Sequence, residues 1–90
     1  MYAVIEHVYF YKEKELVDFN VKTYRLTKNE SNAVNALNNR ISELRESYDY
    51  AEMAKEGSEV HIKLKRQDDY RIDYTYEYVL DIFENPTVLP

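Results

Sequence analysis

The two histidines are the residues in this chain best suited to bind a metal ion. His7 and His61 could share one face of a sheet, with Glu6 or Glu59 completing a ligand set of the kind that zinc accepts. In a regular strand, however, successive side chains point to opposite faces, so Glu6 points away from His7. The spacing therefore gives little support for a metal site, and we expect none.

Patterns for nucleophilic or nucleotide chemistry are also missing. The chain has no cysteine and only one glycine, which argues against thiolate chemistry and against a glycine-rich phosphate loop. Asp68 and Asp69 are the remaining acid–base candidates, and adjacent aspartates are more typical of a turn. We therefore expect a protein that is not an enzyme and that uses no cofactor.

Negative charge is concentrated between residues 43 and 59. This stretch holds six acidic and two basic residues, a net charge of −4, while the whole chain has −5. If the stretch ends a helix, the helix dipole disfavours each acid by about 0.3–1 kcal/mol. One interpretation is a solvated helix surface; the other is a binding surface for a partner protein with a basic surface. The candidate protein-binding residues are Glu43, Glu46, Tyr48, Asp49, Tyr50, Glu52 and Glu56.

Tyrosines recur at alternate positions near the C-terminal end, among ten in the chain. Rings on one face of a sheet can stack nucleobases, but such platforms normally come with a basic groove, and a net charge of −5 argues against one. We expect the rings to form the sheet side of the core. The ladder holds Tyr70, Tyr74, Tyr76 and Tyr78, and the cations expected on the other face are Lys63, Lys65, Arg66 and Arg71.

A long amphipathic helix from Thr27 to Gly57 is the predicted element that positions the acidic residues. Thr27 and Glu30 match a capping box, with Ser31 as a rival cap, and Gly57 suits a helix C-terminus. The helix would be about 43 Å long, against about 36 Å for an eleven-residue strand. We therefore expect it to overhang, bend or break near residues 48–50. Its apolar stripe consists of Val34, Leu37, Ile41, Leu44, Tyr48 and Ala51.

Strand-like segments flank this helix at residues 2–12, 16–26, 58–66 and 70–80. The first is apolar at both parities, so we expect the helix on one face and the C-terminal tail or a second subunit on the other. The second alternates, with Val17, Phe19 and Val21 on one side, as in a half-exposed strand. Turns are predicted at residues 12–15 and 67–69, and Ile82 and Phe83 are expected to dock on the domain.

The order strand, strand, helix, strand, strand predicts an α+β fold, β-β-α-β-β. One long helix would pack across a four-stranded, mainly antiparallel sheet with the most apolar strands, the first and the last, at its centre. Ninety residues fit a single domain, 1–90, with the tail 81–90 docked or partly flexible. No run of about 18 apolar residues and no signal-peptide layout are present, so we expect a cytoplasmic protein without a membrane span.

In its small size, acidity and content of tyrosine and asparagine, the chain resembles proteins that phages and mobile elements encode. That resemblance in style suggests a non-catalytic, anti-defence or anti-CRISPR type of inhibitor. Its acids between residues 43 and 59 would occupy the basic groove of a host nucleic-acid-handling enzyme. The alternatives are a structural homodimer that buries the second face of the first strand, and a single-stranded nucleic-acid binder that uses the tyrosines.

Overall fold

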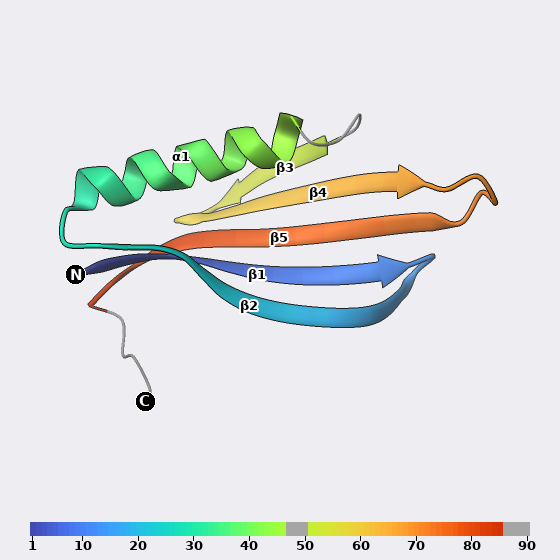
Figure 1. The fold of residues 1–90 in the computed structure, drawn as a ribbon, viewed down its shortest axis with the longest axis horizontal. Helices are drawn as coiled ribbons and strands as arrows, with labels where there is room; N and C mark the ends of the chain where they lie inside the picture. The colour runs from blue at the N-terminus through green and yellow to red at the C-terminus, as the bar shows by residue number, and fades with distance from the viewer. Residues whose placement is uncertain (47–50, 86–90) are drawn as a thin grey trace.

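A computed structural model describes residues 1–46 and 51–85. Within them, one helix and five strands follow in the order β1 (Tyr2–Lys12), β2 (Glu15–Thr27), α1 (Glu30–Glu46), β3 (Ala51–Glu56), β4 (Glu59–Gln67) and β5 (Asp73–Glu84). All paired strands are antiparallel, and their order across the sheet is β2-β1-β5-β4-β3 (Figure 1). The α+β class is confirmed, and the first and last strands are central, as predicted.

The predicted four-stranded sheet is wrong, because the chain forms an additional strand, β3, where the helix was expected to continue. β3 pairs with β4 from Ala51 opposite Leu64 to Glu56 opposite Glu59. Pairing satisfies the backbone groups along the edge of β4, whereas an overhanging helix would have no sheet to pack on. Gly57, at φ 63°, begins the two-residue turn between β3 and β4 instead of ending a helix.

α1 ends at Glu46, so the helix does stop in the region where its length predicted a break. Its 17 residues span about 25 Å. The predicted break point at residues 48–50 itself lies outside the described residues. Among the described residues, α1 is the helix to consider as a membrane span, and it is neither long enough nor apolar enough to cross one.

Asn29 caps the N-terminus of α1, and the predicted cap at Thr27 is wrong. Asn29 Oδ1 accepts hydrogen bonds from the Ser31 backbone N–H at 2.9 Å and from the Ser31 hydroxyl at 2.6 Å. Thr27 is the last residue of β2, and its extended backbone places it before the first turn. Its hydroxyl oxygen accepts a hydrogen bond from the Asn29 backbone N–H at 3.3 Å, and this contact helps to position the capping residue.

The core lies between α1 and one face of the sheet. Its first cluster holds Leu44, Val60, Ile62, Leu64 and Leu80, and its second holds Val4, Ala33 and Ala36. Tyr76 and Tyr78 pack against the first cluster, so their predicted place under the helix is confirmed. Leu37 packs against both clusters, but Val34 is 41% exposed, so the predicted stripe is wrong there. Ala33 and Ala36, rather than Val34, are the buried residues of this part of α1.

The strands extend beyond α1, which covers only part of their length (Figure 1). Where α1 ends, aromatic rings continue the apolar layer: Phe10 stacks on Tyr76 with ring centroids 4.7 Å apart and on Tyr74 at 5.8 Å. Ile82 packs against the second cluster as predicted. Phe83 is 40% exposed, which contradicts its expected docking.

Candidate protein-binding surface

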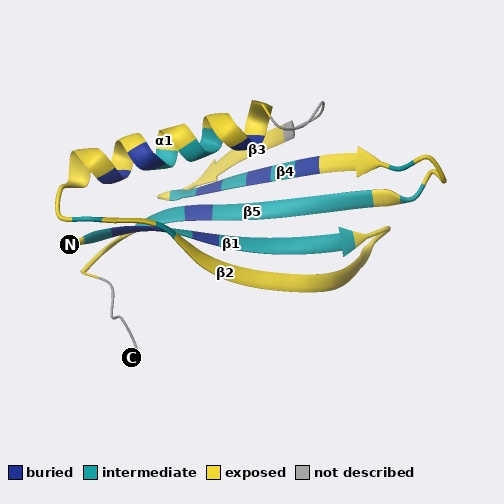
Figure 2. Ribbon diagram, in the orientation of Figure 1, coloured by how far each residue is buried: buried dark blue, intermediate teal, exposed yellow. Residues whose placement is uncertain are grey.

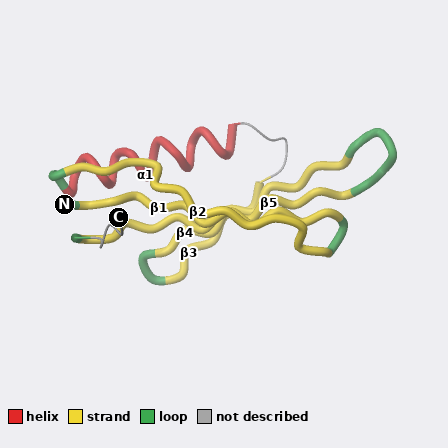
Figure 3. Tube along the Cα trace, turned by 60° about the horizontal axis from the view of Figure 1, so that its bottom comes forward, coloured by secondary structure: helices red, strands yellow, loops and turns green. Residues whose placement is uncertain are grey.

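The face of the sheet opposite α1 has no helix or strand packed on it among the described residues, and we call it the open face (Figure 3). Its residues follow from the alternation of side chains: Glu6 and Val4 point to α1, so His7 and Tyr9 point away. Across the strands, His7 lies between Val21 and Val79, and Tyr9 lies next to Phe19. Apolar and aromatic side chains therefore dominate the half of this face formed by β1 and β2.

Phe19 anchors an aromatic layer on the open face. Its ring centroid lies 5.0 Å from that of Tyr9 and 6.3 Å from that of His7. Phe19 and Val21 are 49% and 50% exposed, so the alternation predicted for this strand places its apolar side chains toward open space. A contiguous apolar patch of this kind is rare on a protein without a binding partner.

β2 is also an edge strand, and nearly all of its residues are exposed (Figure 2). Natural edge strands are usually short or carry charges that discourage pairing. β2 has 13 residues, and four of its large apolar side chains besides Phe19 are each 50% exposed. These are Leu16, Val17, Val21 and Leu26. The exposed apolar side chains are the feature of β2 that suits protein binding, because its edge carries Asp18, Lys22 and Arg25 and two register shifts against β1, which discourage edge pairing.

The half of the open face on β3, β4 and β5 is charged. Lys63 and Lys65 of β4 lie beside Glu77 and Thr75 of β5, and Lys65 Nζ is 3.8 Å from Glu52 Oε1. Toward the other end of β4, carboxylates replace the lysines. They are Glu56, Glu59 and Asp81, the last accepting a hydrogen bond from the Ser58 hydroxyl at 3.1 Å. The charge thus changes sign along β4 alone, because Glu77 of β5 and Glu52 of β3 lie beside Lys63.

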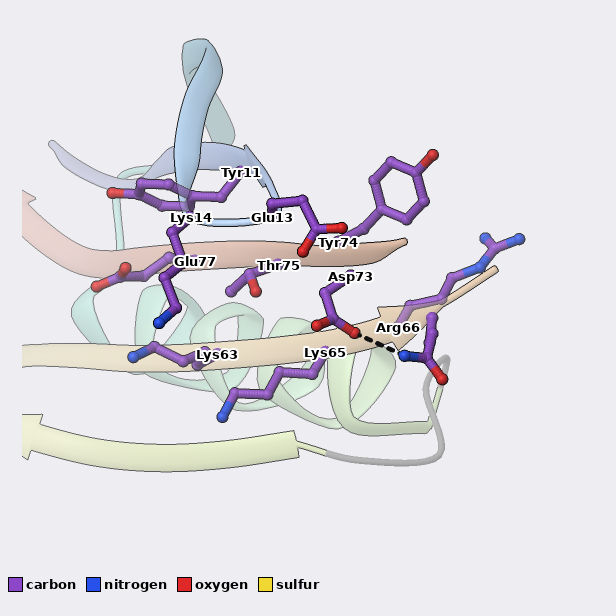
Figure 4. A pocket seen from close by; sticks show the side chains of 11 residues that line it. Tyr11, Glu13, Lys14, Lys63, Lys65, Arg66, Asp73, Tyr74, Thr75 and Glu77 are labelled. Atoms are coloured by element: carbon purple, nitrogen blue, oxygen red, sulfur yellow. Dashed lines mark hydrogen bonds between the residues drawn. The ribbon is translucent and has the colours of Figure 1, made fainter. Parts of the chain in front are cut away.

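An open cavity of about 680 Å³ lies at the basic end (Figure 4). Lys14, Lys63, Lys65 and Arg66 line it together with the acids Glu13, Asp73 and Glu77. Four cations against three acids do not make the basic groove that tracks a phosphate backbone. Tyr76 and Tyr78 pack toward α1, so the tyrosine ladder and Lys63 lie on opposite faces. This separation weakens the nucleic-acid alternative.

The predicted acidic binding residues do not form one helical surface. Glu43 and Glu46 belong to α1, whereas Glu52 and Glu56 belong to β3. Glu43 accepts hydrogen bonds from Tyr24 and Arg40 on the helix side of the sheet, and Glu52 contacts Lys65 on the open face. Tyr48, Asp49 and Tyr50 lie outside the described residues.

The two histidines share the open face, as the strand parity suggested, with Val79 between them. Glu6 is on the other side, as expected. His61 Nε2 lies 3.0 Å from Glu59 Oε2 and 3.5 Å from Glu56 Oε2. These three side chains include the donor types of a metal site. Such a group of polar side chains is also ordinary on a hairpin, and nothing else in the described residues points to an ion.

A buried ion pair joins α1 to β1, and sequence reasoning missed it. Glu6 is 0% exposed and accepts hydrogen bonds from Arg40 Nη2 at 2.9 Å and Nε at 3.1 Å. Burial opposes the charge of Arg40, but Glu6 and Glu43 outweigh it and raise the pKa of Arg40. The signal was present: Glu6 is the one acid in its strand parity, and Arg40 falls between Leu37 and Leu44 in the helical repeat.

The rings of two tyrosines enclose the Arg40 guanidinium. Its carbon lies 5.4 Å from the ring centroid of Tyr24 and 5.9 Å from that of Tyr78. Burial and the hydrogen bond to Glu43 raise the pKa of the Tyr24 hydroxyl. Every polar group in this cluster has a partner, which fits a structural role at the helix–sheet interface.

No protein-family model matches the chain, and neither a curated protein nor a solved structure matches it.

Proposed function

We propose that this protein is a non-catalytic protein-binding module and that the open face is its binding surface. The observation that carries the proposal is the row of half-exposed apolar side chains on β2, packed beside the aromatic side chains of β1. Binding interfaces are enriched in aromatic residues and bury an apolar centre inside a polar rim. The apolar half of the open face and its charged neighbour on β4 have this composition.

The proposal moves the binding surface away from the acidic residues singled out in the sequence. Glu43 and Glu46 lie across the sheet from Glu52, so a groove lined with basic residues would not meet all of them together. An inhibitor that presents these acids to a basic host enzyme is the second form of the proposal. Reversing Glu46, which belongs to α1 and lies away from the open face, to lysine tests it, because binding carried by these acids would weaken while binding through Phe19 would persist.

Affinity capture with matched variants tests the open face. The tagged chain, its Phe19→Lys/Val21→Lys variant and a Val34→Lys control are compared in lysate from the cells that produce the protein. Val34 is 41% exposed on α1, away from the open face, so the control adds a charge at an equally tolerant place. We expect chains captured by the wild type and the control, a second copy included, to be absent with the open-face variant. Equal capture by all three would refute the proposal.

A further inference from the structure

We infer that a cavity on the α1 side of the sheet binds an uncharged, planar aromatic molecule. The cavity is open to solvent and has a volume of about 390 Å³. Cavities that bind small organic molecules have volumes of about 300–1,000 Å³. Its floor and the open face lie on opposite sides of the sheet, so a small molecule here and a protein bound there are separate events.

Antiparallel pairing arranges the lining of the cavity in rows across β2, β1 and β5. Successive rows are Lys22 and Glu6, then Asn20, Val8 and Tyr78, then Asp18, Phe10 and Tyr76. β1 therefore supplies an apolar floor beyond Glu6, β5 an aromatic wall and β2 a polar wall. A ring with a polar substituent matches this division, because the ring can lie on β1 and β5 while the substituent faces β2.

α1 leaves this part of the sheet uncovered (Figure 1). Its N-terminal half packs beside β1 through Ala33 and Ala36, and its C-terminal half packs on β4 through Leu44. Val8 and Phe10 lie farther along β1, belong to neither buried cluster and remain partly exposed. The cavity is thus the part of the core side of the sheet that the helix does not reach.

The exposed rings favour a flat aromatic ligand over an aliphatic one. The ring centroids of Phe10 and Tyr76 lie 4.7 Å apart, with the ring planes at 29°. Both residues are partly exposed and line the cavity. A third aromatic ring can extend this stack and gains stabilisation beyond that of the buried area, which an aliphatic ring of the same size does not.

The charges around the cavity favour an uncharged ligand. Glu6 and Asp18 line it together with Lys22 and Arg40, so neither an anion nor a cation meets an excess of opposite charge. A charged ligand would lose hydration without a dedicated partner, which is costly. Asn20 lies between Asp18 and Lys22 on β2 and is exposed, and its amide can both donate and accept a hydrogen bond. An uncharged carboxamide or ring nitrogen is the kind of group that it can bind.

Four matched probes test this ligand class. They are benzamide, which is uncharged and planar, benzoate, which is anionic, the benzamidinium ion, which is cationic, and cyclohexanecarboxamide, which is uncharged and not planar. Titration of the ¹⁵N-labelled chain should show benzamide shifting the NMR signals of the Asn20 side-chain amide. We expect benzamide to bind at least roughly fivefold more tightly than each of the other three, because it alone combines a stacking ring with the absence of charge.

Asn20→Ala should weaken benzamide binding by about fivefold, because the probe loses its hydrogen-bond partner. Asn38→Ala is the matched control, since Asn38 is exposed on α1 outside the cavity, and it should bind benzamide like the wild type. A chain that binds none of the probes up to their solubility limits would overturn the inference. Equal affinity for benzamide and cyclohexanecarboxamide, tighter binding of a charged probe, or benzamide binding unchanged by Asn20→Ala would overturn it as well. None of these results affects protein capture by the open face.

Discussion

Glu6 and Arg40 form an ion pair across the helix–sheet interface, with Arg40 Nη2 2.9 Å from Glu6 Oε1. Along α1, Arg40 lies between Ala36 of the second core cluster and Leu44 of the first. The carboxylate is 0% exposed, while the guanidinium keeps 20% exposure at the edge of the interface. Because an unpaired buried carboxylate is costly, this pair favours the position of α1 in which Arg40 meets Glu6.

Replacing Arg40 by methionine should destabilise the protein by about 3 kcal/mol, since it leaves a buried carboxylate without its partner. The double variant Glu6→Leu/Arg40→Met should recover most of that loss, because it removes both charges and keeps the volume apolar. Urea unfolding of the four proteins in this cycle measures the coupling. A double variant less stable than Arg40→Met alone would contradict the assignment.

Asn29→Ala should lower the free energy of unfolding by about 1 kcal/mol, because the Ser31 N–H loses its acceptor. In a domain of this size, that loss lowers Tm by about 4–8 °C. Thr27→Val should cost less, since Thr27 is a strand residue whose hydroxyl makes only a 3.3 Å contact. Thermal unfolding followed by circular dichroism compares the two variants. A greater loss of unfolding free energy for Thr27→Val would indicate that Thr27 is the N-cap residue.

Glu13→Gly should stabilise the protein by about 0.5–1 kcal/mol. Glu13 has φ 56° in the turn between β1 and β2, a conformation that costs a residue with a side chain more than it costs glycine. The hydrogen bond from the Glu13 N–H to the Asp73 carbonyl oxygen needs no side chain and is retained. Lys14→Gly is the matched control and should not stabilise, since Lys14 has no positive φ.

Part of the stability of the folded protein should depend on the ionised Asp68 carboxylate and should be lost at low pH. Its carboxylate accepts hydrogen bonds from the backbone N–H groups of Ile72 and Tyr70 and from the Tyr74 hydroxyl, which lower its pKa. A lowered pKa in the folded state contributes stability above the ordinary aspartate pKa of about 3.9 and loses it as pH falls through the lower value. The Tm difference between wild type and Asp68→Asn should therefore shrink below about pH 4. A difference that is constant from pH 7 to pH 3 would contradict this.

The central strands could be predicted because their signals are local. β1 is a run of β-branched and aromatic residues, the residues of β5 alternate with period two, and the polar residues 12–15 mark the hairpin. β3 could not be predicted, since Glu52, Ala54 and Lys55 favour helices and become a strand only through pairing with β4. Pairing with β4, which follows after a two-residue turn, overrides the helix propensity of these residues.

The binding surface was partly visible in the sequence. Apolar residues at both parities of β1 predicted a second face in need of a cover, and the described residues leave that face open. The mixed charge beside Lys63, with Glu77 and Glu52 as its neighbours, was not visible, because it depends on the register of three strands. The acidic residues were predicted to lie on one helix. Because α1 ends at Glu46, they are divided between α1 and β3.

The β1–β5 pairing has a consequence for synthesis of the protein. Tyr2 pairs with Glu84 and Lys12 with Tyr74, so the two central strands come from opposite ends of the printed sequence. During synthesis, β1 and β2 leave the ribosome before β5, so β1 has no partner on its second edge until β5 has left the exit tunnel. Such long-range closure makes folding slow relative to helical domains of similar size. During that interval Phe19 and its neighbours are the segment that chaperones would need to shield from aggregation.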